Sequence, residues 1–232
     1  MKRVLLKLSG EALAGEKKTG FDEATVIEVA KQIRTIAEEG LEIGIVIGGG
    51  NFWRGRTSET IDRNKADQIG MLATVMNCIY VSDICRYLGL KTEIFTPFVC
   101  GAFTSLYSKD AVEASFVQGK IVFFAGGTGH PYFSTDTATV LRAVEIEAEA
   151  ILLAKAVDGI YDSDPKTNPN AKKYDSVHIQ EVIDQKLAVV DLTASILCME
   201  NKMPMMVFGL NEENSIIRAA KGEIDGTKVL VD

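Results

Sequence analysis

Short, almost continuous apolar segments alternate along this chain with longer segments in which apolar residues recur at helical spacing. Segments such as Ile121–Ala125 are apolar at successive positions, which is typical of parallel strands that are covered on both faces. The pattern predicts strands at Arg3–Leu8, Ile43–Ile47, Thr92–Thr96, Ile121–Ala125, Ala150–Ala154, Met205–Phe208 and Lys228–Val231.

The longer segments are predicted to be helices. Between Asp22 and Glu39 the apolar side chains have helical periodicity, and Asp22 can cap the start of this helix while Gly40 can end it. Further helices are predicted at Lys65–Leu88, Asp110–Val117, Asp136–Glu149, Ile179–Gln185, Asp191–Glu200 and Glu213–Lys221. Because strands and helices alternate and no repeat or linker interrupts them, we expect an α/β fold, a three-layer αβα sandwich around a central, mostly parallel twisted sheet, in one domain or two closely packed lobes.

Charge and composition narrow the class of protein. The net charge of −7 argues against broad nucleic-acid binding, which needs a basic face. The continuous apolar runs are too short to cross a bilayer, and Lys7 interrupts the apolar start in a way that secretory signals do not. The cysteines lack metal-ligand spacing and are expected to be buried free thiols: Cys78, Cys85, Cys100 and Cys198. We therefore expect a cytoplasmic protein that has neither a nucleic acid nor a membrane as partner.

Four loops rich in polar groups follow predicted strands, at the edge where open parallel sheets bind ligands. They are Lys7–Gly10, Gly48–Gly55, Gly126–Asp136 and Lys155–Asp164. Positive charge is concentrated near two of them, at Lys2, Arg3 and Lys7 and at Arg54, Arg56, Arg63 and Lys65. An anionic ligand at this edge is therefore expected.

The common phosphate motifs are absent from these loops. Gly48–Trp53 and Gly127–Tyr132 both lack the third glycine of the dinucleotide fingerprint, and Glu16 stands where a P-loop needs lysine. The carboxylates of Asp158, Asp162 and Asp164 lack the glycine and glutamate of an EF-hand. The sequence therefore favours a nucleotide or phosphate site of another design.

Each loop has a functional and a structural interpretation. Lys7 can place its ammonium group over a transferring phosphate, or it can be a solvated lysine at a strand end. Gly48–Gly50 can admit a phosphate beside the guanidinium of Arg54, or form a plain tight turn.

The loop before the helix at Asp136 is also open to two interpretations. Thr128–Thr135 can bind an anion at the helix N-terminus and hold a flat base with its two aromatic residues, although Ser134 and Thr135 can equally be ordinary caps. Asp136 can hold Mg²⁺ or complement the helix dipole. Asp191 starts another predicted helix, where it can complement that helix's dipole or pair with a lysine that faces a phosphate.

The order of these motifs resembles the amino acid kinase superfamily. The motifs are Lys7-Leu-Ser-Gly10, the triple glycine with Asn51 and Arg54, Gly127-Thr-Gly129, Asp136 and Val157-Asp-Gly-Ile-Tyr161. Within the superfamily the chain is most similar to the bacterial uridylate (UMP) kinases, on the segments LKLSGEAL, IGGGNFWRG, Asp67 followed by Met71–Asn77, and TGHPYFSTD. The resemblance covers essentially the whole chain and implies that residues 1–232 form a single domain with the amino acid kinase fold. The acceptor side would lie mainly in the N-terminal part and the ATP side mainly in the C-terminal part.

The resemblance implies a reaction and a set of site residues. The reaction is phosphorylation of UMP to UDP by Mg·ATP, by direct in-line transfer, in pyrimidine nucleotide biosynthesis. The implied catalytic residues are Lys7, Asp136 and Asp191, with Asp136 as the Mg²⁺ ligand. The implied ATP-binding residues are Lys7, Leu8, Ser9, Gly10, Gly50, Arg54, Lys155, Tyr161 and Asp164. The implied UMP-binding residues are Gly49, Asp67, Thr128, Gly129, His130, Pro131, Tyr132, Phe133, Ser134 and Thr135.

Some features depart from the family or stay open. His130 stands where many members have asparagine, and Lys155 stands where threonine is common, so the role of Lys155 is left open. The resemblance also implies a homohexamer that UTP inhibits and GTP activates, and the apolar helix around Met71–Leu88 suits either an interface or a core. A kinase with an acyl or carbamoyl acceptor and a non-catalytic nucleotide-sensing module are the alternative functions.

Overall fold

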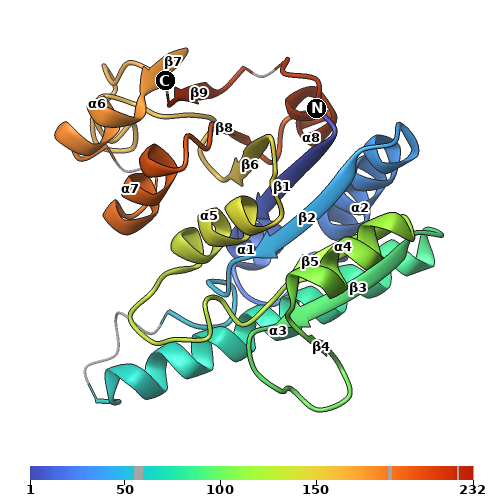
Figure 1. Cartoon of the computed structure of the whole chain (residues 1–232). Coiled ribbons are helices and arrows are strands. Elements are labelled where there is room, and N and C mark those ends of the chain that lie inside the picture. The colour runs from blue at the N-terminus through green and yellow to red at the C-terminus, as the bar shows by residue number, and fades with distance from the viewer. Residues whose placement is uncertain (55–59, 188–189, 224, 232) are drawn as a thin grey trace.

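The computed structural model describes residues 1–54, 60–187, 190–223 and 225–231. In this part of the chain the strands form one nine-stranded sheet in the order β4-β3-β5-β2-β1-β6-β8-β9-β7, with helices on both faces (Figure 1). Neighbouring strands run parallel except β8 and β9, which are antiparallel. The predicted α/β sandwich with a mostly parallel sheet is confirmed.

The elements have the following bounds. The strands are β1 (Arg3–Leu8), β2 (Glu42–Ile47), β3 (Lys91–Thr96), β4 (Ser105–Leu106), β5 (Lys120–Phe124), β6 (Ala150–Lys155), β7 (Ser176–His178), β8 (Met205–Gly209) and β9 (Thr227–Leu230). The helices are α1 (Gly10–Leu13), α2 (Glu23–Glu38), α3 (Arg63–Tyr87), α4 (Lys109–Val117), α5 (Thr135–Glu145), α6 (Ile179–Asp184), α7 (Leu192–Glu200) and α8 (Ser215–Ala220), with a short 3-10 turn at Gly15–Lys17.

Two hydrophobic cores lie on the two faces of the sheet. Successive side chains of a strand point to opposite faces, so Leu6 packs with α2, α3 and α8 on one face. Leu5 packs with α4, α5, α6 and α7 on the other face. The central strand β1 is therefore buried on both sides, which explains its continuous apolar sequence.

Most predicted elements are present, with differences at their ends. Asp22 caps α2 by accepting a hydrogen bond from the Thr25 amide at 2.9 Å, as predicted. The helix expected at 136–149 ends at Glu145, because the chain turns into a left-handed conformation at Glu147 (φ 55°). The last predicted helix begins at Ser215 rather than Glu213. The short elements α1, β4 and β7 were not predicted.

The helix α3 is long and apolar enough to cross a membrane by length and composition alone, and its most apolar 18-residue window has a mean hydropathy of 1.3. It is instead a partly buried core helix, since 44% of its most apolar window lies inside the fold. Val81 and Cys85 pack into the core under the sheet. Leu72 and Met76 lie on its exposed side, where they are 52% and 46% exposed.

Candidate active site

The polar loops predicted to bind an anion meet at one edge of the sheet. Lys7 lies near the carboxyl end of β1, opposite Val46 of β2 on one side and Leu153 of β6 on the other. The triple glycine directly follows β2, and the loop from Gly126 begins two residues after the end of β5. Parallel strands end at the same edge, so the side chains that follow them converge there.

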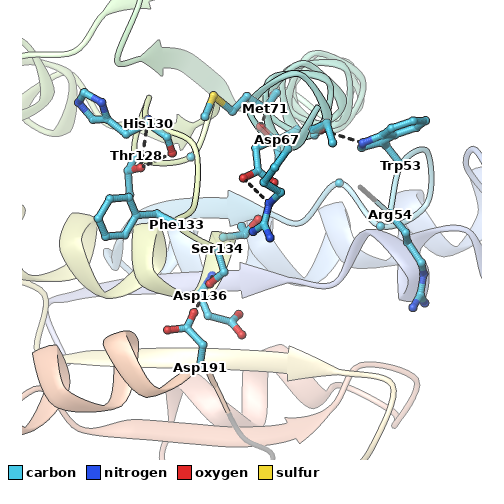
Figure 2. A pocket seen from close by; sticks show the side chains of 18 of the residues that line it. Trp53, Arg54, Asp67, Met71, Thr128, His130, Phe133, Ser134, Asp136 and Asp191 are labelled. Carbon is cyan, nitrogen blue, oxygen red and sulfur yellow. Dashed lines mark hydrogen bonds and ion pairs between the residues drawn. The ribbon is translucent and has the colours of Figure 1, made fainter. Parts of the chain in front are cut away.

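Three cavities at this edge are lined by predicted site residues. The largest of these three, of about 580 Å³, is lined by Gly49, Gly50, Trp53, Arg54, Arg63, Ala66, Asp67, Gly70, Met71, Thr74, Gly127, Thr128, His130, Phe133, Ser134, Thr135, Asp136, Val190 and Asp191 (Figure 2). A smaller one, of about 230 Å³, is lined by Lys7, Ser9, Gly10, Glu11, Gly48, Gly49, Gly50, Ser134, Thr135 and Asp136. These two share five lining residues and are therefore adjacent. The third, of about 430 Å³, is lined by residues that include Lys155, Tyr161, Asp164 and Lys166.

An ion pair lies where the first two cavities meet. The Lys7 Nζ is 3.0 Å from the Asp136 Oδ1, and the Lys7 side chain is only 11% exposed. An ammonium group that is buried to this extent does not belong to a solvated lysine at a strand end. The structural interpretation of Lys7 is therefore wrong. Asp136 lies in the first turn of α5, where the helix dipole also favours its negative charge. Asp136 therefore lies in the wall common to both cavities, and Lys7 lies beside it in the smaller one.

Ser134 ties the start of α5 to the start of α7. Its hydroxyl accepts hydrogen bonds from the amides of Asp136 (3.0 Å) and Thr137 (3.2 Å), so it is the N-cap of α5. The same hydroxyl donates to the carboxylate of Asp191, and the Thr137 hydroxyl donates to it at 3.1 Å. Asp191 also caps α7 by accepting from the Ala194 amide at 3.0 Å. The capping alternative for Ser134 is confirmed, whereas the cap that Asp191 makes was not predicted. Together the two caps fix two helix starts relative to each other.

The triple glycine is held by a buried pair of amides. Asn51 and Asn77 exchange two hydrogen bonds, at 3.0 and 2.8 Å, and Asn77 also donates to the Gly48 carbonyl at 2.7 Å. A Cβ added at Gly49 would lie 3.0 Å from the Ala73 Cβ and from the Gly70 carbonyl, which places this loop tightly against α3. A side chain at Gly10 would lie 2.2 Å from the Gly48 carbonyl. The glycines therefore allow the backbone of this loop to approach both α1 and α3.

Asp67 connects α3 to the loop that precedes α5. Its Oδ2 accepts from the Arg63 Nε at 2.8 Å and from the Tyr132 amide at 2.8 Å. Tyr132 has a left-handed backbone (φ 72°), and the Arg63 guanidinium lies 5.3 Å from the centre of its ring. Figure 2 shows Asp67 and Met71 on α3, across the cavity from Asp136 and Asp191. The cavity wall therefore depends on this carboxylate.

The third cavity is supported by an ion pair. The Tyr161 hydroxyl donates to Asp158 Oδ1 at 2.8 Å, and the Lys173 Nζ donates to Asp158 Oδ2 at 2.8 Å. Lys173 also donates to the Asp225 carbonyl at 2.6 Å, so this loop is fastened to the segment before β9. Sequence reasoning missed Lys173, because its partner is 15 residues away and no local motif links the two.

The structure brings most predicted site residues to the cavities. The predicted UMP residues that line the largest cavity are Gly49, Asp67, Thr128, His130, Phe133, Ser134 and Thr135. Gly129, Pro131 and Tyr132 are not among its lining residues, although the Tyr132 amide holds Asp67.

The predicted ATP residues divide among the three cavities. Lys7, Ser9, Gly10 and Gly50 line the smaller cavity, and Lys155, Tyr161 and Asp164 line the third. Arg54 lines the largest cavity and forms an ion pair with Glu11, a residue that sequence reasoning missed. The Leu8 side chain is fully buried in the core, so only its backbone can face a ligand. Gly55, the last residue of the predicted loop, and Arg56 of the predicted positive cluster lie outside the described residues.

The side chains at these cavities supply one carboxylate ligand for Mg²⁺ and not a complete set. In the ranges that the structure describes, no three His, Cys, Asp or Glu side chains converge as a metal site. Mg²⁺ in phosphoryl-transfer sites commonly takes one or two carboxylates and completes its shell with phosphate oxygens and water. The single carboxylate of Asp136, at the wall of two cavities, fits that arrangement.

Comparisons with known proteins find one family model that matches most of the chain and solved structures that match nearly all of it. Residues 2–209 match the model of the amino acid kinase family. The structure of a UMP kinase from Bacillus anthracis is similar at 36% identity and a TM-score of 0.95, over 100% of this chain and 96% of that chain. A UMP kinase from Ureaplasma parvum matches at 34% identity and a TM-score of 0.93, over 99% of this chain and 98% of that chain. A uridylate kinase from Archaeoglobus fulgidus matches at 26% identity and a TM-score of 0.73, over 99% and 100%. The chain belongs to the amino acid kinase family.

Proposed function

We propose that this protein is a UMP kinase, which transfers the γ-phosphoryl group of ATP to UMP and releases UDP and ADP. The observation that carries the proposal is the full-length similarity to two UMP kinases at 34% and 36% identity. The ion pair of Lys7 and Asp136, placed where two cavities meet, supports it from the chemistry of the site.

The reaction needs positioning and charge neutralisation rather than a covalent intermediate. An oxygen of the UMP phosphate forms a bond to the γ-phosphorus, and the bond from that phosphorus to the bridging oxygen of ATP breaks. The electron pair of the broken bond stays on the oxygen that becomes part of ADP. Lys7 would stabilise the charge on the transferring group, since its ammonium group is already desolvated and fixed by Asp136.

The cavities suggest where each nucleotide binds. UMP would occupy the largest cavity, with its ribose at Asp67 and its uracil in the loop Thr128–Thr135. The phosphates of ATP would occupy the smaller cavity, and its adenosine would lie in the third, beside Tyr161. We also propose that residues 1–232 are one domain, with an acceptor side mainly in the N-terminal part and a donor side mainly in the C-terminal part.

Magnesium would be held by Asp136 together with phosphate oxygens of the donor. When bound, the ion would neutralise part of the charge of the phosphates. Asp191 would act on the reaction by holding Ser134 and Thr137 at the start of α5, which keeps Asp136 at the wall of both cavities.

Assembly, regulation and location complete the proposal. We expect a cytoplasmic homohexamer that UTP inhibits and that GTP activates. One observation supports assembly: α3 exposes apolar side chains at helical spacing, which another copy of the chain could cover, at Ile69, Leu72, Met76 and Ile79.

A panel of acceptors tests the proposed function. ADP release is measured by a coupled assay with Mg·ATP and UMP, CMP, AMP, carbamate or N-acetylglutamate as acceptor. The proposal predicts turnover with UMP and little with the others, and it predicts that UTP lowers the rate. Turnover with carbamate or N-acetylglutamate alone would favour an acyl or carbamoyl acceptor. Nucleotide binding without turnover of any acceptor would favour a sensing module.

A further inference from the structure

Lys155 ends β6 at the same edge of the sheet as Lys7. The strands β6 and β1 are parallel neighbours, with Leu153 opposite Lys7 and Ala154 opposite Leu8. The Ser9 amide donates to the Ala154 carbonyl at 3.3 Å, so the pairing continues to the end of both strands.

The two lysines point to the same face of the sheet. Paired residues of parallel neighbours share a face, and residues two apart on one strand also share it, so Lys155, Leu153 and Lys7 point the same way. Leu153 packs into the core on the side of α5. The side chain of Lys155 is therefore directed to the face that carries Asp136, in the first turn of that helix.

The electrostatic surroundings of Lys155 agree with this placement. Burial lowers the pKa of Lys155 to about 8, Asp136 opposes that shift, and the positive charge of Lys7 adds to it. The three groups therefore lie close enough to act on one another. An anion bound beside both lysines would relieve their mutual repulsion.

Lys155 also lies between the two parts of the proposed donor site. It lines the third cavity together with Tyr161 and Asp164, whereas Lys7 and Asp136 line the smaller cavity. If a nucleotide has its nucleoside in the third cavity and its terminal phosphate at Lys7, its inner phosphates lie beside Lys155.

We propose that Lys155 is a further catalytic residue, which binds the inner phosphates of the nucleoside triphosphate donor and stabilises the nucleoside diphosphate that leaves. This inference rests on the proposed function, because it takes ATP as the donor. Negative charge accumulates on the leaving diphosphate when its bond to the γ-phosphorus breaks, and a fixed ammonium group beside that diphosphate lowers the energy of this state. A contact with the adenine base would be the competing role of Lys155.

Binding measurements on two variants separate these roles. Lys155→Met keeps most of the side-chain length and removes the charge, and Lys155→Arg keeps the charge. Calorimetry with ADP and with adenosine should show that Lys155→Met weakens ADP binding by about tenfold and leaves adenosine binding unchanged. Lys155→Arg should recover most of the ADP affinity, and Lys155→Met should lower kcat/KM for ATP while KM for UMP stays constant.

Two controls make the result decisive. Lys91→Met makes the same change of charge at the opposite edge of the sheet, at the first residue of β3, and should bind ADP like the native chain. Equal losses of ADP and adenosine binding in Lys155→Met, or no loss of either, would overturn the inference. ADP binding does not depend on the acceptor, so a failure of UMP turnover in the native chain would refute the proposed function and leave this measurement interpretable.

Discussion

The ammonium group of Lys7 and the carboxylate of Asp136 form a 3.0 Å ion pair that joins the central strand β1 to the first turn of α5. The two residues are far apart in the sequence, and both line the smaller cavity. The pair connects the wall of the acceptor cavity with the site proposed for the donor phosphates. Its removal is therefore the most direct change that can be made to the proposed chemistry.

Asp136→Asn should reduce UMP-dependent ADP release by about 100-fold or more, because it removes the charge that fixes Lys7 and would hold Mg²⁺. Steady-state kinetics measure the loss, and circular dichroism checks the fold. Asp110→Asn is the matched control, since Asp110 is the acidic residue in the first turn of α4. Native turnover in Asp136→Asn would exclude Asp136 from the mechanism.

Ser134→Ala should lower both stability and turnover. It removes the N-cap of α5, which costs about 1 kcal/mol, and also the hydrogen bond to Asp191. Ser108→Ala removes the N-cap of α4, where the Ser108 hydroxyl accepts from the Ala111 amide, and should lower stability alone. Chemical denaturation and kcat are compared for both variants. Equal turnover in the two would mean that Ser134 serves only as a cap.

Asp67→Ala should raise KM for UMP by about tenfold and leave KM for ATP unchanged. The carboxylate accepts a hydrogen bond from the Tyr132 amide and lines the acceptor cavity. Asp67 does not line either of the cavities proposed for the donor. Asp83→Ala changes an exposed acidic residue of the same helix and is the control. A rise in KM for both nucleotides would contradict the division into an acceptor and a donor cavity.

Lys173→Met should raise KM for ATP several-fold with little effect on KM for UMP. Lys173 fixes Asp158, which in turn accepts a hydrogen bond from Tyr161 in the third cavity. Lys172→Met, at an exposed neighbouring position, provides the control. The opposite pattern, with UMP affected and ATP unchanged, would place the donor elsewhere.

The buried cysteines should resist thiol reagents in the native protein. Burial raises the pKa of Cys85 and of Cys198 to about 12, and it raises the pKa of Cys78 further, so these thiols stay protonated at pH 8. Cys100 is half-buried and should react first. An unfolded chain releases these protons near pH 9 while the folded chain keeps them, so stability should fall as pH rises above about 9. Rapid native labelling of all four thiols at pH 8 would contradict the structure.

The parts of the fold predicted from sequence are those with a strong local signal. β1 and β2 are continuous apolar runs because both faces are buried, and Asp22 marks the start of α2. β4 and β7 have 2 and 3 residues, too few for a periodic pattern. They form because neighbouring strands offer hydrogen bonds, and a local sequence pattern does not show where those neighbouring strands lie.

In the candidate site, too, the residues predicted from sequence are those with a strong local signal. Lys7 and the triple glycine were found because Lys7 lies near the end of a predicted strand and the glycines directly follow one. The contacts that fix them are long-range: Ser134 and Asp191 are 57 residues apart, and Asn51 and Asn77 are 26 apart. Glu11 and Thr74 have ordinary local sequences, and only the folded chain shows that Glu11 pairs with Arg54 and that Thr74 accepts from the Gly126 amide.

The central claim is that the γ-phosphoryl group of ATP passes to UMP. Phosphorus NMR of the purified chain with Mg·ATP and UMP tests it, with Asp136→Asn as the reference of low activity. The account predicts that the signals of UMP and ATP decrease together while those of UDP and ADP increase in equal amounts, and that no inorganic phosphate forms. Loss of ATP to ADP and inorganic phosphate without UDP, or no change with UMP present, would contradict it.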